Sequence, residues 1–165
     1  MLRHQACIAE VHGSADAGKL LWVDDSRPLL GLYKTIFEGL GFQVQIASCP
    51  QEALDCLDSH DADMAILDYE MPEMNGCMLA SLMKSRRPEL PVILYSSSVS
   101  IPEHADRWVD AVCSKAAPRE VLLEIIESTL AQRNALPSSE RLLHGCFTPR
   151  PEFAAEIRRE LRRVI

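Results

Sequence analysis

The sequence is poor in glycine and aromatic residues, and it has no long hydrophobic run. Its 7 Gly and 10 Pro in 165 residues exclude a collagen-like chain, and its 47% of hydrophobic residues exclude a disordered one. Six cysteines without a C-x-x-C pair or a suitably spaced His exclude a dense disulfide scaffold and a zinc site. We therefore expect a single globular domain with reduced thiols.

Segments that would direct the chain to a membrane are also lacking. No apolar run approaches the roughly 18 residues that cross a bilayer. The N-terminal stretch has one Arg and no sustained apolar segment, so it lacks the pattern of a signal peptide. We expect a cytoplasmic protein without membrane contact.

Charge is divided unevenly along the chain. The net charge is -7, from 17 Lys and Arg against 24 Asp and Glu. Residues 132–165 hold 7 Arg and 4 Glu, a net +3, which leaves 10 basic and 20 acidic residues, a net -10, for residues 1–131. We predict a flexible N-terminal tail over residues 1–17, a domain over 18–131, and a linker with a short basic amphipathic helix over 132–165.

From Lys19 onward, short apolar runs alternate with longer stretches at helical spacing. This alternation is typical of an α/β fold of three layers, in which helices cover both faces of a doubly wound, five-stranded parallel sheet. The predicted strands are Lys19–Asp24, Phe42–Ala47, Met64–Asp68, Val92–Ser96 and Ala111–Ser114. The predicted helices are Arg27–Gly39, Pro50–Ser59, Gly76–Ser85, a short one after Ile101-Pro102, and Arg119–Ala131.

Polar side chains stand at the carboxyl ends of four of these strands, the edge where such folds bind ligands. Asp24 and Asp25 end the first strand, Asp68 the third and Ser96 the fourth, and Lys115 follows the fifth. Carboxylates that are brought together repel one another, and Mg²⁺ suits a site of oxygen ligands that needs this repulsion relieved. A lysine and a hydroxyl beside the metal would bind a tetrahedral oxyanion. The pattern predicts a phosphoryl site in which one Asp is the nucleophile.

These residues stand in motifs that resemble the receiver domain of two-component response regulators. The segment DYEMPEMNG at residues 68–76 is similar to the family's loop after the phosphorylated Asp. Three further segments are similar to the family's other strand ends: VDDS at 23–26, PVILYSS at 91–97 and SK at 114–115. The resemblance covers about residues 18–131 and implies a (βα)5 flavodoxin-like fold with the strand order 2-1-3-4-5.

The resemblance also implies which groups carry the chemistry. Asp68 would accept a phosphoryl group from a sensor histidine kinase or a phosphotransfer protein, and the phosphorylated module would then act on an unnamed downstream protein. It would catalyse only its own phosphorylation and slow dephosphorylation, so it is not a turnover enzyme. The implied Mg²⁺ ligands are Asp24, Asp25, Asp68 and the backbone carbonyl of Glu70, and the implied phosphoryl contacts are Lys115 and the switch hydroxyl of Ser96.

Three positions depart from the family pattern. Ala116 follows Lys115 where Pro is usual, Val112 stands where an aromatic residue is common, and Ser96 replaces the commoner Thr. The usual coupling through an aromatic ring is therefore absent in that form, which leaves open a receiver-like interaction scaffold that does not switch. A magnesium phosphohydrolase is disfavoured because such enzymes typically place a second Asp two residues after the nucleophile, where this chain has Glu70.

The last residues, Pro151–Ile165, have the pattern of a short basic amphipathic helix. Apolar residues recur at helical spacing on one face and arginines lie around it: Phe153, Ile157, Leu161 and Val164 against Arg158, Arg159, Arg162 and Arg163. About 14 residues are marginal for an isolated helix, so this one needs a surface to pack on. The alternatives are its own acidic domain, a second copy in a homodimer, and a partner protein; DNA and membrane binding are not expected.

Overall fold

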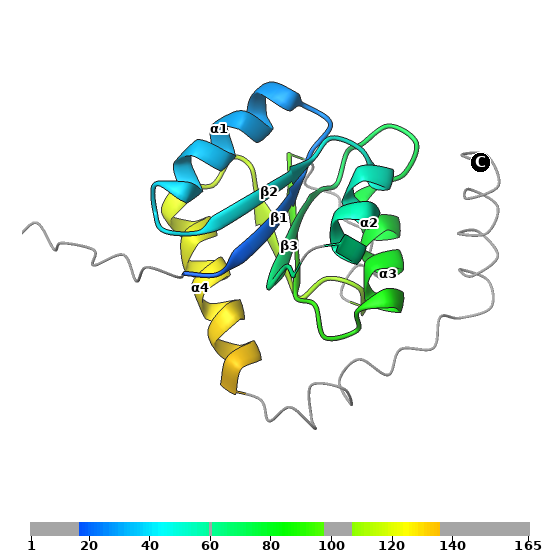
Figure 1. The fold of residues 1–165 in the computed structure, drawn as a ribbon. Helices are drawn as coiled ribbons and strands as arrows, with labels where there is room; N and C mark the ends of the chain where they lie inside the picture. Colours follow the sequence, from blue (N-terminus) through cyan, green and yellow to red (C-terminus); the bar gives the residue numbers. More distant parts are fainter. Residues whose placement is uncertain (1–16, 60, 98–106, 136–165) are drawn as a thin grey trace, which may run out of the picture.

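A computed structural model describes residues 17–59, 61–97 and 107–135 of the chain (Figure 1). Strands and helices alternate along most of this part, as the apolar pattern predicts. In chain order the elements are β1 (Lys19–Val23), α1 (Arg27–Glu38), β2 (Gln43–Ala47), α2 (Pro50–Ser59), β3 (Met64–Asp68), α3 (Gly76–Arg86), β4 (Val92–Ser96), β5 (Ala111–Ser114) and α4 (Arg119–Ala135).

The five strands form one parallel sheet in the order β2-β1-β3-β4-β5. Helices α1 and α4 cover one face of the sheet, and α2 and α3 cover the other (Figure 1). This arrangement confirms the predicted three-layer, doubly wound fold and its flavodoxin-like strand order.

Alternate residues along the strands supply two separate cores. Leu21 and Val23 of β1 pack in the core beneath α2 and α3, whereas Leu20 and Trp22 pack in the core beneath α1 and α4. The central strands β3 and β4 are buried at every residue, which is why their sequences are continuously apolar. The sheet is thus a rigid platform for the loops at its carboxyl edge.

Two observed boundaries differ from the predicted ones in a way that matters. Strand β1 ends one residue before Asp24, so this carboxylate belongs to the loop that follows. Helix α4 continues past the predicted end at Ala131 to Ala135. Its last turn is anchored, because Arg133 Nη1 donates to the backbone carbonyl of Asp63 at 2.7 Å and to its Oδ1 at 3.0 Å.

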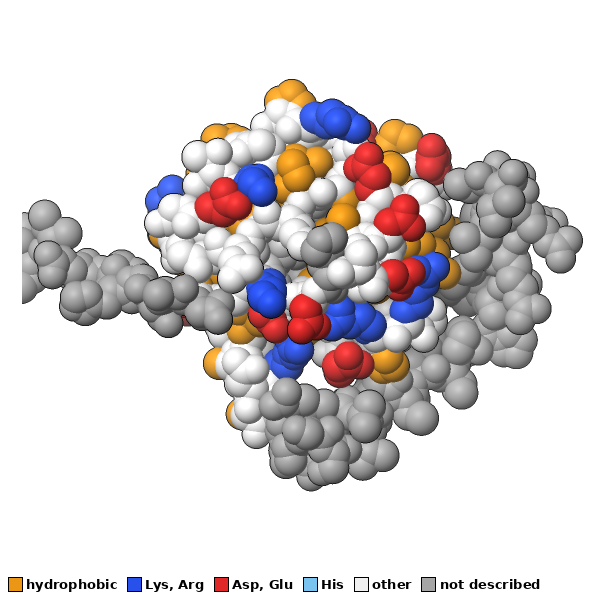
Figure 2. Space-filling model, viewed as in Figure 1, with side chains coloured by type: hydrophobic (Ala, Val, Ile, Leu, Met, Phe, Trp, Pro, Cys, Tyr) orange, Lys and Arg blue, Asp and Glu red, His pale blue; other side chains and the backbone are white. Residues whose placement is uncertain are grey.

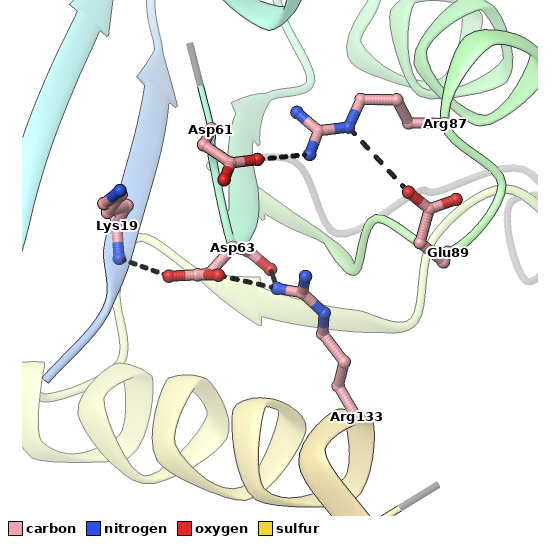
Figure 3. A network of polar contacts seen from close by, with 6 residues as sticks. All are labelled: Lys19, Asp61, Asp63, Arg87, Glu89 and Arg133. Atoms are coloured by element: carbon pink, nitrogen blue, oxygen red, sulfur yellow. Dashed lines mark hydrogen bonds and ion pairs between the residues drawn. The ribbon is translucent and has the colours of Figure 1, made fainter. Parts of the chain in front are cut away.

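Figure 3 shows that this anchor belongs to a network at the amino edge of the sheet. The other oxygen of Asp63 accepts from the backbone N–H of Lys19 at 2.9 Å. Nearby, the guanidinium of Arg87 pairs with Asp61 at 3.1 Å and with Glu89 at 3.9 Å. Each carboxylate in this network faces a guanidinium, and Arg87 is shared by Asp61 and Glu89.

Several predicted segments lie outside the described residues. They are the short helix after Ile101-Pro102, the N-terminal tail as far as residue 16, and the basic amphipathic helix within residues 136–165. The division of the chain into tail, domain and C-terminal extension therefore stays a prediction. In the part that the structure describes, no helix is both long and apolar enough to cross a membrane.

Candidate functional site

Three loops at the carboxyl edge of the sheet bring Asp24, Asp68 and Lys115 together. Asp24 follows β1, Asp68 is the last residue of β3, and Lys115 follows β5. The carboxyl ends of parallel strands meet at one edge, so residues far apart in the sequence become neighbours there. Asp24 is only 1% exposed and Asp68 only 5%, so two carboxylates lie in the interior.

Both buried carboxylates share the ammonium group of Lys115. Its Nζ lies 2.7 Å from Asp24 Oδ2 and 3.0 Å from Asp68 Oδ2. Burial opposes the charged form of Lys115, but the contacts with Asp24 and Asp68 outweigh it and raise the pKa of the ammonium above its usual value. Lys115 therefore stays protonated and supplies one positive charge to two negative ones.

Asp68 is poorly stabilised as a carboxylate. Besides its contact with Lys115, its Oδ1 accepts a long hydrogen bond of 3.3 Å from the backbone N–H of Glu70. Burial raises the pKa of Asp68 above its usual value even though Lys115 acts to lower it, and the charge of Asp24 adds to the rise. A weakly solvated carboxylate of this kind is suited to act as a nucleophile.

Asp25 adds a third carboxylate to the site from the solvent side. One oxygen from each of Asp24, Asp25 and Asp68 lies within 4.8 Å of the others. Asp25 is exposed, and among the described residues it forms no ion pair. Three carboxylates against one ammonium leave an excess of negative charge in an all-oxygen donor set, which fits a hard divalent cation such as Mg²⁺. Glu70 lies in the loop just beyond Asp68 and is exposed.

The main chain of β4 and the turn after β5 direct Lys115 into the site. Ser96, the last residue of β4, is 1% exposed, and its carbonyl accepts from the backbone N–H of Lys115 at 2.8 Å. The peptide between Lys115 and Ala116 is trans. Ser114 Oγ accepts from the backbone N–H of Ala116 at 3.1 Å and so stabilises the turn that lacks the usual Pro.

An Asn-Gly pair holds the loop after β3 close to Asp68. A Cβ at Gly76 would collide with the carbonyl oxygen of Asp68, so a larger residue would push the loop away. Asn75 Oδ1 accepts from the backbone N–H of Met78 at 3.0 Å and thereby caps α3. The backbone N–H of Gly76 donates to the carbonyl of Tyr69 at 3.0 Å. The loop is thus folded back over the site.

An aromatic cluster beneath Lys115 was missed by sequence reasoning. Trp22 stacks on Tyr33 with ring centroids 4.5 Å apart, and Tyr95 meets both edge-on at 5.9 and 5.7 Å. The Nζ of Lys115 lies 5.9 Å from the centroid of the Tyr95 ring. Burial, reinforced by Tyr33, raises the pKa of Tyr95 to about 12, so its hydroxyl stays neutral. The alternation of side chains along β4 was the signal that could have placed Tyr95 on the α1 side.

Val112 takes no part in this aromatic cluster. It lies on β5, three residues before Lys115, and its side chain is 43% exposed. The ring nearest to the ammonium of Lys115 therefore comes from β4 instead of β5.

The chain is similar in sequence to a known family of proteins. The model of the response regulator receiver domain matches residues 20–127. The response regulator SaeR of Staphylococcus epidermidis is 34% identical over 110 residues, which are 63% of this chain and 47% of that protein. SaeR of Staphylococcus aureus is 32% identical over 112 residues, or 48% of its length. The chain thus spans about half the length of these curated relatives.

Solved structures give the same result for the fold. A CheY-like receiver domain protein from Methanospirillum hungatei superposes with a TM-score of 0.67 and 27% identity, covering 71% of this chain and 96% of the other. The response regulator TrrA of Thermotoga maritima, solved in complex with Mg²⁺-BeF, gives a TM-score of 0.64 at 24% identity, covering 68% of this chain and 98% of the other. The second likeness bears on the fold alone.

Proposed function

The chain belongs to the response regulator receiver domain family, and on that premise we propose that it is a phosphorylation-switched signalling module with Asp68 as its phosphoacceptor. Accepting a phosphoryl group is the general role of this family. One observation carries the assignment of the residue: Asp68 is a buried carboxylate held 3.0 Å from the ammonium of Lys115 at the carboxyl edge of the sheet.

The donor in this proposal is a phosphohistidine on a sensor histidine kinase or a phosphotransfer protein. A carboxylate oxygen of Asp68 attacks the phosphorus, the bond from phosphorus to the imidazole nitrogen breaks, and the electron pair leaves with the imidazole. The product is an acyl phosphate on Asp68. Lys115 lies where its charge can stabilise the phosphoryl oxygens during transfer, and electrostatic stabilisation is the main source of catalysis in such reactions.

The proposed metal site uses Asp24, Asp25, Asp68 and the backbone carbonyl of Glu70. The all-oxygen donor set and its excess negative charge support this assignment, as described above. Bound Mg²⁺ would supply positive charge to the phosphoryl oxygens and offset the repulsion among the carboxylates. Asp25, which is exposed and unpaired among the described residues, is the ligand that an incoming ion meets first.

In this proposal the Ser96 hydroxyl binds the phosphoryl group and reports its presence. Ser96 is buried at the end of β4, next in sequence to Tyr95 of the aromatic cluster. Movement of Ser96 toward the phosphoryl oxygens would shift this strand end, and the new surface would be recognised by a downstream protein. The trans turn at Ser114 lets Lys115 keep its place without the usual Pro.

The second candidate is an interaction scaffold that keeps the fold and does not switch. The exposed, non-aromatic Val112 favours it, because the usual aromatic coupling on β5 is lacking. The two functions differ in one measurable respect, which is whether partner binding or oligomeric state changes on phosphorylation.

The experiment is the intact mass of the protein after incubation with acetyl phosphate, with and without Mg²⁺. We expect a gain of one phosphoryl group that requires Mg²⁺ and is absent in Asp68→Asn. The control is Asp61→Asn, a carboxylate that is 85% exposed at the opposite edge of the sheet and should leave phosphorylation as in the wild type. No gain under any condition, together with no Mg²⁺ binding, would leave the scaffold as the better explanation.

A further inference from the structure

An open hollow lies beside the proposed phosphorylation site. It has a volume of about 490 Å³ and is formed by the loop after β1, the start of α2 and the loop after β3. Its apolar lining comes from Pro28, Pro50, Met71 and Pro72. Its charged lining comes from two acidic residues, Asp25 and Glu73, and one basic residue, Arg27. We call it the rim hollow. Since Asp25 also belongs to the carboxylate cluster, whatever fills the rim hollow touches the edge of the site.

The surface around the rim hollow is acidic. Helix α2 exposes Glu52, Asp55 and Asp58 and contains no Lys or Arg, although Glu52 pairs with Arg27 and Asp58 pairs with Arg86. Figure 2 shows Asp and Glu side chains gathered over this helix. Glu70 and Glu73 in the loop after β3 are exposed, and neither forms an ion pair with any residue in the described ranges. The hollow is thus apolar within and negatively charged around its border.

The chain itself contains a segment of matching chemistry. Residues 151–165 carry four apolar residues at helical spacing and four arginines around them, as described above. A segment of this pattern needs an apolar surface for one face and carboxylates for its border. The rim hollow offers both.

The intervening chain is long enough to reach. Helix α4 ends at Ala135, at the amino edge of the sheet, where Arg133 is anchored to Asp63. The 15 residues from 136 to 150 span at most about 50 Å when extended and about 20 Å on average as a flexible coil. The two edges are separated by the length of β3, which has 5 residues and is about 17 Å long, and the segment must also pass from the face covered by α4 to the face covered by α2. The segment can therefore reach the rim hollow of its own molecule.

We propose that residues 151–165 dock in the rim hollow of the same molecule, with their apolar face on Met71 and the prolines and their arginines beside Glu70, Glu73 and α2. A short tether holds the segment at an effective concentration of about 1 mM, so a contact with a Kd of about 0.1 mM between separate molecules is closed in about nine of ten tethered ones. A weak interaction is sufficient.

In this proposal the docked segment would lie beside Asp25, which lines the rim hollow and also belongs to the carboxylate cluster. It would bring arginines near the carboxylates that are proposed to bind Mg²⁺. Phosphorylation is then slower than in a molecule whose hollow is empty. This last step rests on the proposed function, whereas the docking itself does not.

The test compares backbone hydrogen exchange in the full chain with that in Ile157→Ser/Leu161→Ser, which removes the apolar face and keeps every charge. The matched control is Ala155→Ser, on the opposite face of the predicted helix. We expect up to about tenfold faster exchange in the variant at residues 24–28, 48–52 and 69–74, and no change in the control. Glu73→Lys should speed exchange at these residues as the double variant does. Glu127→Lys changes an exposed residue of α4 and should leave their exchange unchanged.

The outcomes are distinct. Unchanged exchange at the rim hollow in both Ile157→Ser/Leu161→Ser and Glu73→Lys overturns the proposal. Protection in the wild type that disappears on tenfold dilution also overturns it, because the occupant would then be a second copy. Phosphorylation by acetyl phosphate should be up to about tenfold faster in the double variant. If no protein is phosphorylated while the exchange difference is present, the proposed function fails and the docking stands.

Discussion

The two edges of the sheet hold charged clusters of opposite character. At the amino edge, Asp63 is satisfied by Arg133 and by the backbone N–H of Lys19, and Arg87 serves Asp61 and Glu89 (Figure 3). At the carboxyl edge, one ammonium is shared by two buried carboxylates, and a third carboxylate has no ion pair among the described residues.

The two clusters differ in how well their charges are satisfied, and the carboxyl-edge cluster is the candidate site. At the amino edge each of these carboxylates has a cationic or N–H partner, although the buried Nε of Arg133 has no hydrogen-bond partner in the described part of the chain. The contacts there can therefore stabilise the fold and anchor α4. An excess of negative charge at the carboxyl edge costs stability, and such sites persist where a ligand compensates for the charge. Four measurements test this difference between the two edges.

The largest effect is expected for Lys115→Met, which removes the single cation of the carboxyl edge. It leaves two buried carboxylates uncompensated, so the free energy of unfolding without metal should fall by about 3 kcal/mol. Millimolar Mg²⁺ should restore part of the loss. The measurement is urea unfolding with and without Mg²⁺. The control is Lys84→Met, since the Lys84 side chain is 15% exposed against 16% for Lys115 and pairs with Asp110. An equal Mg²⁺ response in both variants would contradict the contrast.

The next effect is expected at the amino edge for Asp63→Ala. The variant removes the carboxylate that accepts from Arg133 and from the backbone N–H of Lys19, although Arg133 still donates to the backbone carbonyl of residue 63. The free energy of unfolding should therefore fall by about 1–2 kcal/mol. Mg²⁺ should not restore it. Asp61→Ala is the control, because Asp61 is 85% exposed and its pair with Arg87 should contribute less than about 0.5 kcal/mol. Equal losses in the two variants would mean that Asp63 is not the anchor.

A smaller effect of opposite sign is expected for Asp68→Asn. The substitution removes one of three neighbouring like charges, so the free energy of unfolding without metal should rise by about 1 kcal/mol. The same variant should lose most of the stabilisation that Mg²⁺ gives to the wild type. Thermal unfolding at several Mg²⁺ concentrations measures both. A loss of stability in Asp68→Asn would show that the carboxylate is already compensated.

The smallest effect is expected in the pH dependence of the difference in unfolding free energy between Asp68→Asn and the wild type. The pKa of Asp68 is raised in the folded state, chiefly by burial, so its charged form is a cost at neutral pH. This cost disappears as the pH falls through the raised pKa, because the folded state then binds a proton that the unfolded state does not. The stability gap between Asp68→Asn and the wild type should therefore narrow on acidification. Urea unfolding at a series of pH values without metal tests this, and a widening gap would contradict it.

Much of the fold and the positions of the candidate site followed from local patterns. Continuous apolar runs marked β3 and β4 because central parallel strands are buried on both faces. Placing Asp24, Asp68 and Lys115 at strand ends was sufficient to expect them together, since parallel strands end at one edge. The segment around Asn75-Gly76 marked the loop, and the structure explains Gly76 by its close approach to the carbonyl of Asp68.

Contacts between distant segments could not be read from the sequence. The last turn of α4 persists because Arg133 meets Asp63, 70 residues earlier. Tyr95 lies against Trp22 and Tyr33 only once β4, β1 and α1 are assembled. Local patterns can show which face of the sheet a residue such as Tyr95 occupies, but they do not show which distant side chain it meets there.

The order of strands and helices along the chain could be read from the sequence alone, and so could the types of residue at each strand end. Both depend on periodicity and turn residues, which act over a few neighbouring residues. How the charges are shared depends on the tertiary structure. One ammonium between Asp24 and Asp68, an exposed Asp25 and a satisfied Asp63 depend on distances and burial that exist only after the sheet has formed. Electrostatic energies depend on those two quantities, so the difference between the edges appears only in the folded protein.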